Sequence, residues 1–346
     1  MVLYLQWKLR KVDLTHERPK ECEDLPRKKR KMCPVCSATL KSTSEEYSLR
    51  ELLDLWKPIE FSQNVVAALS EQADFTHLFI CPECKLEIFL PQIIGTPEFY
   101  SELSRQETLH YYEEDKWEFG EALKDLDRDA SVIEMGCGSG SFLKKIKPFV
   151  SEVCGIEPNP HAFQVAQGNG LKVFGTAEDI SELKGHFDSA FCFHVLEHVA
   201  DPTEFLKSIS LLVKPGGRIG ISVPNQDGPV KFINPCIQNM PPHHATRWHR
   251  RTFRFLAEKS GLKIKRMICE PLTSRSHYYY STYWVNHVLP QGLRSLCWVD
   301  SSLRRGFPQL FELLFRGLAV LRIRSFPLLK GQGLYVLLST QGKDKV

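Results

Sequence analysis

From residue 131 onward, short apolar runs alternate with segments of helical periodicity. This alternation is typical of a parallel β-sheet whose strands are joined by helices. The expected strands are 131–135, 152–157, 172–174, 187–193, 217–223, 262–270 and 333–339. The pattern therefore predicts an α/β fold with a Rossmann-like, doubly wound, seven-stranded sheet.

The preceding residues show a different pattern. Two Cys-Pro-x-Cys turns enclose runs of helical spacing at 47–56 and 64–69, and an aromatic, acidic segment follows. We expect five parts, in chain order: an N-terminal extension (1–31), a small module with a helical insert (32–91), a helical lead-in (92–128), the sheet domain (129–271 and 331–346), and a helical insertion or lid before the last strand (272–330).

Composition narrows the class of protein. The chain has 346 residues, 42% of them hydrophobic and 25% charged, with a net charge of +4. These values are ordinary for a globular protein and give no strong nucleic-acid signal. Because Lys8 interrupts the first apolar stretch and no run approaches the roughly 20 apolar residues of a membrane span, we expect a cytoplasmic protein with reduced or metal-bound cysteines. The basic run 27–31 is read as a solvated linker, with a targeting signal as the alternative.

A glycine-rich loop follows the first expected strand. Gly136, Gly138 and Gly140 alternate with other residues between that strand and a helix start, and Glu134 stands two residues before the first glycine. Glycines let a ligand approach the backbone closely. An acid at that position would repel a pyrophosphate but suits an ammonium group. The loop therefore favours a nucleoside with a cationic tail over a dinucleotide.

Two further acidic turns extend this predicted site. Glu157, followed by Pro158, ends the second strand, where a carboxylate is placed to accept ribose hydroxyls. After the third strand, Ala177 offers a backbone N–H to an adenine ring, and Glu178 or Asp179 is placed to accept from its amino group.

Together these turns resemble those of the class I S-adenosylmethionine-dependent methyltransferases over about residues 130–225. The resemblance implies S-adenosylmethionine as methyl donor, with Phe193 and His194 lining the floor near its methyl group. The full expected cofactor set is Glu134, Gly136, Gly138, Gly140, Glu157, Pro158, Ala177, Glu178, Phe193 and His194. A glycine turn of purely structural origin and a nicotinamide site are the alternatives.

Two segments bear on the acceptor. Residues 193–202 resemble the H-x-L-E-H-x-x-D-P segment of small-molecule and polysaccharide-pathway methyltransferases, and the Asn-Pro-Pro-aromatic tetrad of amino-group methyltransferases is absent. A second segment, Pro-Pro-His-His at 241–244, follows the fifth strand and is expected to overhang the methyl group. Its His243 and His244 are candidate general bases, because histidine titrates near neutrality, with loop packing as the alternative. His194 is a further candidate, better suited to face the cofactor than to act as the base.

The two cysteine turns predict a metal site. Cys33, Cys36, Cys81 and Cys84 supply four thiolates in two C-x₂-C knuckles, a set typical of closed, structural Zn²⁺ sites. Redox chemistry or plain packing is the alternative. Similar units precede many bacterial-type methyltransferase domains.

The expected function is methyl transfer to a small-molecule or glycan-pathway acceptor, at oxygen. A zinc-containing RNA methyltransferase and a non-catalytic cofactor-binding scaffold are the alternatives. The insertion is read as a helical cover or a homodimer contact, and its basic stretch 303–330 as a candidate for peripheral membrane contact.

Overall fold

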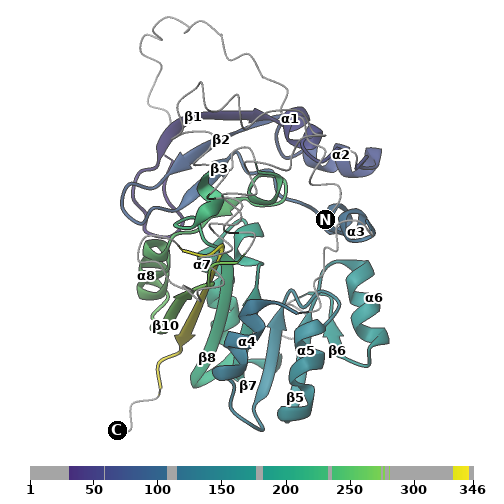
Figure 1. Ribbon diagram of the computed structural model, residues 1–346, viewed down its shortest axis with the longest axis vertical. Coiled ribbons are helices and arrows are strands. Elements are labelled where there is room, and N and C mark those ends of the chain that lie inside the picture. The colour runs from purple at the N-terminus through teal and green to yellow at the C-terminus, as the bar shows by residue number, and fades with distance from the viewer. Residues whose placement is uncertain are drawn as a thin grey trace, which may run out of the picture.

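The computed structural model describes residues 31–57, 59–106, 115–176, 182–232, 236–273, 276, 280 and 330–342. These residues form two sheets, a four-stranded one near the top of Figure 1 and a seven-stranded one below it. The order of the strands in each sheet, and the helices that cover the sheets, decide where functional side chains meet.

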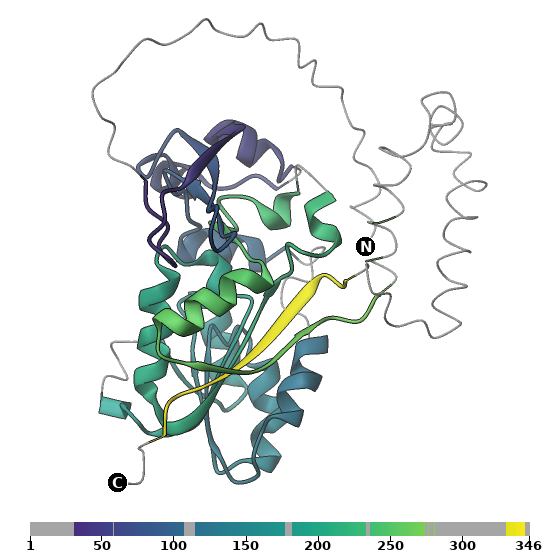
Figure 2. The same cartoon turned by 90° about the vertical axis from the view of Figure 1, so that its left-hand side faces the viewer.

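All seven predicted strands of the large sheet are present. In chain order they are β4 (Ser131–Met135), β5 (Glu152–Ile156), β6 (Lys172–Phe174), β7 (Phe187–Phe193), β8 (Val213–Pro224), β10 (Lys263–Cys269) and β11 (Gly333–Ser339). Their order across the sheet is β10-β11-β8-β7-β4-β5-β6. Neighbouring strands from β6 to β8 are parallel, whereas β11 is antiparallel to both β8 and β10, between which it runs in Figure 2. The predicted seven-stranded α/β fold is confirmed.

Helices cover both faces of this sheet. On one face lie α4 (Trp117–Lys124), α5 (Ser141–Ile146) and α6 (Pro160–Gly168), which share an apolar core with Phe191 and Tyr335. On the other lie α7 (Pro202–Leu212) and α8 (Arg250–Lys259), whose buried residues join a core with Ile133 and Val336. This two-layer burial explains why the strands read as short continuous apolar runs.

The small sheet is built from two distant parts of the chain. Its order is β1 (Lys41–Ser48), β2 (Phe75–Ile80), β3 (Glu87–Leu90) and β9 (Thr246–Arg247), all antiparallel. Three helices accompany it, α1 (Leu49–Asp54), α2 (Gln63–Ser70) and α3 (Pro97–Ser104). The helical spacing at 47–56 and 64–69 thus corresponds to α1 and α2, but Tyr47 lies in β1, and the pattern did not predict β1–β3. The reason is that β1, KSTSEEYS, is mostly polar and gains its place by pairing with β2.

The small sheet and its cysteine turns, here called the N-terminal module (residues 32–91), pack directly on the large domain. The hydroxyl of Thr203 on α7 donates to the Pro34 carbonyl over 2.9 Å, and that of Thr252 on α8 donates to the Cys84 carbonyl over 3.0 Å. Cys33, Cys81 and Leu86 belong to the same buried cluster as the residues of α7 and α8. One core therefore spans both parts.

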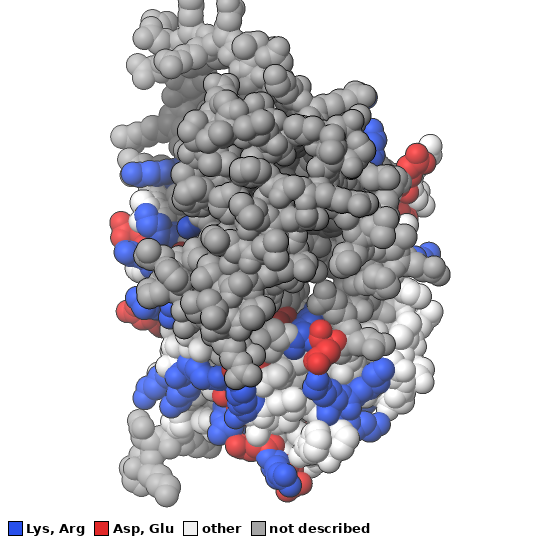
Figure 3. Space-filling model, viewed as in Figure 1, with Lys and Arg blue, Asp and Glu red and all other residues white. Residues whose placement is uncertain are grey.

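Several predicted features fall outside the described residues. They are the basic run up to residue 30, Ala177 and Glu178, and most of the insertion, including all of the 303–330 stretch except Lys330. Within the described part of the chain, no helix is long and apolar enough to cross a membrane. On the face shown in Figure 3, basic and acidic side chains are mixed over the lower half of the molecule.

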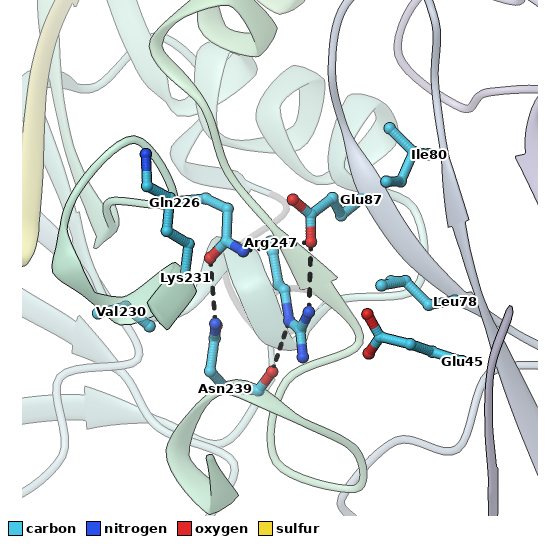
Figure 4. Close-up of a pocket in the computed structure, with 9 residues that line it drawn as sticks. All are labelled: Glu45, Leu78, Ile80, Glu87, Gln226, Val230, Lys231, Asn239 and Arg247. Carbon is cyan, nitrogen blue, oxygen red and sulfur yellow. Dashed lines mark hydrogen bonds and ion pairs between the residues drawn. The ribbon is translucent and has the colours of Figure 1, made fainter. Parts of the chain in front are cut away.

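A buried ionic network joins β3 of the module to the large domain. Glu87 pairs with Arg247 at 3.3 Å and with His249 at 3.1 Å, and His249 also pairs with Asp227 at 2.8 Å. Gln226 donates to Glu87 over 3.3 Å. Figure 4 shows Glu87, Arg247 and Gln226 converging on one cavity of about 230 Å³ between the module and the loop after β8.

The network determines the charge of His249. Burial alone would lower the pKa of this imidazole, but Asp227 and Glu87 raise it to about 9. The same pairing lowers the pKa of Asp227 to about 2, against the opposing effect of burial. At neutral pH His249 is therefore an imidazolium held between two carboxylates.

This pairing predicts a pH-dependent contribution to stability. Since the pKa of His249 is raised above its ordinary value of 6.5, the contribution is complete below that pH and is lost as pH rises through about 9. We expect His249→Gln to lower the free energy of unfolding in urea at pH 6 by about 1.5–3 kcal/mol, the range for hydrogen bonds to charged groups. The difference from the wild type should shrink above pH 9.

His186→Gln is the matched control, because His186 pairs with Glu152 at the surface. Its expected cost is under about 1 kcal/mol. A His249→Gln difference that stayed constant from pH 6 to 10 would contradict the network's role.

Candidate functional site

The glycine loop lies at the carboxyl end of β4 and is tightly constrained. Gly136, Gly138 and Gly140 all have positive φ angles, of 69°, 54° and 80°. A Cβ at Gly136 would lie 2.5 Å from the Val195 side chain, and one at Gly140 would lie 2.1 Å from Leu171. The loop therefore needs glycine for both its backbone conformation and its packing.

Two buried carboxylates flank this loop. Glu157 follows β5, and its two oxygens accept from the backbone N–H groups of Gly138 at 2.7 Å and Asn159 at 2.8 Å. Glu134 in β4 is 3% exposed, and its Oε2 atom has no hydrogen-bond partner among the described residues. Burial raises the pKa of both groups, well above the usual range for Glu134, although Lys116 opposes the shift there. An unsatisfied buried carboxylate is the partner that a cationic ligand group would meet.

His194 connects β7 to the opposite wall of the site. It follows the last residue of β7 with a positive φ of 55°. Its Nε2 lies 2.8 Å from Glu118 Oε1 on α4, and its Nδ1 lies 3.2 Å from Glu197 Oε1. Burial would lower the pKa of His194, but Glu118 and Glu197 raise it to about 10. His194 is thus an imidazolium at neutral pH, which donates hydrogen bonds and does not accept protons.

Beside Glu197, three further histidines come together. His198 lies in the turn after β7, and His243 and His244 lie between the short helix η7 (Ile237–Asn239) and β9. Their ring centroids are 4.5–4.8 Å apart in each pair. Burial lowers the pKa of all three, and that of His243 and His244 falls well below 6.5 because their imidazole neighbours add to the effect.

The N-terminal part of the chain forms one wall of this histidine cluster. The Tyr100 hydroxyl on α3 lies 2.9 Å from His198 Nδ1 and donates to the His243 carbonyl over 3.0 Å. The Trp56 ring meets the His243 ring edge-on, with centroids 5.7 Å apart. Residues that precede the large sheet in the chain thus contact histidines that follow β7 and β8.

The structure brings most of the predicted site residues to one edge of the sheet. The glycine loop, Glu134, Glu157 and His194 lie at the carboxyl ends of β4, β5 and β7, with Pro158 exposed beside Glu157. Phe193 differs, because its ring packs in the core against Phe119 and Phe142, with centroids 5.0 and 4.8 Å away. Any contact of Phe193 with a ligand would therefore come from its backbone.

Sequence reasoning assigned no role to Glu118, Glu197 or His198. Glu197 and His198 stand in the H-x-L-E-H segment, whose spacing is the signal that points to them. Glu118 lies in an acidic, aromatic helix that carries no motif. Only its 2.8 Å contact with His194 reveals it.

The four cysteines of the module also meet. Cys33 Sγ lies 3.5 Å from Cys84 Sγ, Cys36 Sγ lies 3.3 Å from Cys81 Sγ, and all four sulfurs are within 4.8 Å of one another. These separations are too long for disulfides, whose bond is about 2.05 Å, and near the roughly 3.8 Å edge of a tetrahedron with Zn–S bonds of about 2.3 Å.

The two knuckles have the same backbone structure. In each, the first cysteine's carbonyl accepts from the residue four positions on, Ser37 in one and Lys85 in the other, at 2.9 and 3.1 Å. Both of these residues have positive φ angles, of 62° and 70°. The four sulfurs are therefore presented by two equivalent turns, a donor set that fits a closed tetrahedral metal site.

Comparisons with known proteins agree with this geometry. A family model described as "Methyltransferase domain" matches residues 109–266. The ubiquinone biosynthesis O-methyltransferase of Xanthomonas oryzae is 31% identical over 129 residues, covering 35% of this chain and 54% of the relative. That of Chromobacterium violaceum is 33% identical over 115 residues, covering 30% of this chain and 50% of the relative.

The chain thus spans about half the length of these relatives. A solved S-adenosylmethionine-dependent methyltransferase from Mesorhizobium loti superposes with a TM-score of 0.42 at 14% identity, covering 64% of this chain and 97% of its own. The residues that the family model matches include β4 to β8, the glycine loop, Glu134 and Glu157. Residues 109–266 of this chain therefore match a methyltransferase domain, and the chain is similar over part of its length to O-methyltransferases.

Proposed function

We propose that this protein transfers a methyl group from S-adenosylmethionine to an oxygen atom of a small-molecule acceptor. The observation that carries the proposal is the pair of buried carboxylates, Glu134 and Glu157, around a glycine loop whose edge of the sheet also holds the histidine cluster. The relatives named O-methyltransferases support transfer to oxygen and to a small molecule. The net charge of +4 offers nothing specific to an RNA acceptor.

Each acid has a defined task in this proposal. The Glu134 carboxylate pairs with the ammonium group of the donor, which would satisfy its buried Oε2 atom. Glu157 keeps the loop closed through Gly138 while accepting the ribose hydroxyls. Ala177 and Glu178, outside the described residues, remain the predicted adenine contacts.

The donor, when bound, supplies a sulfonium methyl group that is already activated, so the protein must chiefly align the acceptor and remove its proton. His194, as an imidazolium between Glu118 and Glu197, is suited to position groups near the methyl. His243 and His244 are neutral at pH 7, because burial lowers their pKa well below 6.5. Each therefore carries a ring nitrogen with a lone pair, which can accept the acceptor's proton or bind a cation.

Removal of either acid should weaken donor binding. We expect Glu157→Gln and Glu134→Gln to raise the dissociation constant for S-adenosylmethionine by about 10- to 100-fold, since each loses one charge-assisted interaction. Isothermal titration calorimetry measures this dissociation constant. Glu204→Gln, which removes an exposed acid on α7, is the control and should bind like the wild type. Unchanged affinity for S-adenosylmethionine in both Glu157→Gln and Glu134→Gln would show that these residues do not form the donor site.

Loss of the paired imidazoles should affect turnover more than donor binding. We expect His243→Ala and His244→Ala to reduce methyl transfer by about 10²- to 10⁴-fold, the range for acid–base assistance, while calorimetry shows intact donor binding. Mass spectrometry of cell extracts incubated with labelled donor, with and without the enzyme, identifies the acceptor. The same labelled product then gives the rates. Near-wild-type rates in the double variant would show that neither histidine takes part.

We further propose that Cys33, Cys36, Cys81 and Cys84 hold one structural Zn²⁺ ion. Four sulfurs leave no coordination position for water or substrate, so the ion supplies folding energy to a small sheet and no chemistry. The sulfurs lie beside the contacts of Thr203 and Thr252 with the module. The ion would therefore fix the edge of the module that docks on α7 and α8.

Metal analysis tests this second proposal. Purified protein should contain at least one zinc per chain, and Cys36→Ser with Cys81→Ser should lose one equivalent and unfold at a lower temperature. Cys269→Ser, at a half-buried thiol outside the knuckles, should retain both zinc content and stability. Well under one zinc per wild-type chain would refute the site.

A further inference from the structure

His198, His243 and His244 are arranged as a set of metal ligands. Each offers one ring nitrogen, and these three atoms lie within 4.8 Å of one another. They come from two segments, the turn after β7 and the loop before β9, and His243 and His244 are 8% and 4% exposed. Two buried imidazoles and one half-buried imidazole this close together repel one another when protonated and attract a cation when neutral.

A fourth donor stands beside them. Glu197 is fully buried, and its Oε1 lies 3.9 Å from His244 Nε2 and 3.2 Å from His194 Nδ1. Its Oε2 is shielded from solvent and has no hydrogen-bond partner among the described residues. Leaving a carboxylate oxygen buried and unsatisfied costs free energy, which a cation at the histidines would recover.

The surrounding contacts orient two of the rings. Nδ1 of His198 is engaged by the Tyr100 hydroxyl at 2.9 Å and by the His243 carbonyl. Nδ1 of His244 faces Asn239 Oδ1 at 3.5 Å. These contacts leave Nε2 of both rings as the ligand atom, and such fixing of the second nitrogen is typical of metal-binding histidines.

From these contacts we propose that His198, His243, His244 and Glu197 bind one divalent transition-metal ion, separate from the ion at the cysteines. Imidazole nitrogens with one carboxylate suit Zn²⁺, Fe²⁺ or Co²⁺, whereas Mg²⁺ and Ca²⁺ favour sites made wholly of oxygen. The coordination spheres of these ions exceed four when solvent or substrate is admitted, so an exchangeable position remains for an acceptor oxygen.

The role of this ion rests on the proposed O-methyl transfer. With His243 and His244 acting as ligands in place of proton acceptors, an acceptor hydroxyl bound to the ion would lose its proton to solvent, because the cation lowers the pKa of the bound oxygen. The oxygen then bonds to the methyl carbon while the sulfur–carbon bond breaks. The electron pair of the broken sulfur–carbon bond stays on sulfur, which becomes a neutral thioether. Glu197 and His194 link the ion to the end of β7, where the cofactor pocket begins.

Equilibrium dialysis against Co²⁺, with zinc retained at the cysteines, tests the site. Wild type and His186→Ala, a variant at an exposed histidine, should each bind one Co²⁺ per chain beyond their zinc. His198→Ala and His244→Ala should bind it at least about tenfold more weakly. The proposal would be overturned if the wild type did not bind Co²⁺, or if both alanine variants bound it with the affinity of the wild type.

Glu197→Gln keeps the side-chain volume, so it decides the case if an alanine variant fails to fold, and it too should weaken Co²⁺ binding about tenfold. Unchanged Co²⁺ affinity in a folded Glu197→Gln variant would also overturn the four-ligand site. Glu134→Gln separates this proposal from the proposed function. It should lose S-adenosylmethionine affinity and keep its Co²⁺, whereas His244→Ala should lose Co²⁺ and keep donor binding. If neither the wild type nor any variant bound S-adenosylmethionine while Co²⁺ still bound, only the proposed function would be refuted.

Discussion

A few backbone hydrogen bonds around Ala245 and Thr246 connect the parts of this protein. The N–H of Ala245 donates to the Glu197 carbonyl over 2.9 Å, and its own carbonyl accepts from Phe89 over 3.1 Å. Thr246 pairs with Ile88, so the segment completes the small sheet. One short strand thus ties the turn after β7 to the N-terminal module. Because the two preceding residues are His243 and His244, the same bonds place both imidazoles against His198.

That constraint gives the module a role in the site as well as in folding. Tyr100 and Trp56 reach the histidine cluster from elements that precede the large sheet. The sulfur cluster lies beside the contacts by which Thr203 and Thr252 hold the two knuckles on the large domain. A structural ion that stiffens the knuckles would therefore hold one wall of the site in position. Precise placement of this kind matters when alignment carries much of the catalysis.

Charge burial is the second organising feature. Glu134, Glu157 and Glu197 are each at most 5% exposed, and together they form a strongly acidic interior at one edge of the sheet. Such a concentration is costly without cationic partners. The His194 imidazolium balances part of this negative charge, since Glu118 and Glu197 keep His194 protonated. The remaining need for positive charge, at Glu134 and at Glu197, is the physical reason why we propose a sulfonium- and ammonium-bearing ligand at the first and a metal ion at the second.

The amino-acid sequence by itself determined the large sheet. Its central strands are buried on both faces and read as apolar runs, and all seven strands were predicted within a few residues. The glycine loop with Glu134 and Glu157 could be placed because local spacing sets them at strand ends. The cysteine knuckles were equally readable, because two residues between thiols fix a turn.

Only the tertiary structure decided the rest. The polar strand β1 is specified by its partner β2, and β9 joins a sheet whose other strands lie more than 150 residues earlier in the chain. Glu118 meets His194, and His198 meets His243, across 76 and 45 residues of sequence. Local pattern carries no information about such pairs, because their contact energy arises only after the intervening chain has folded.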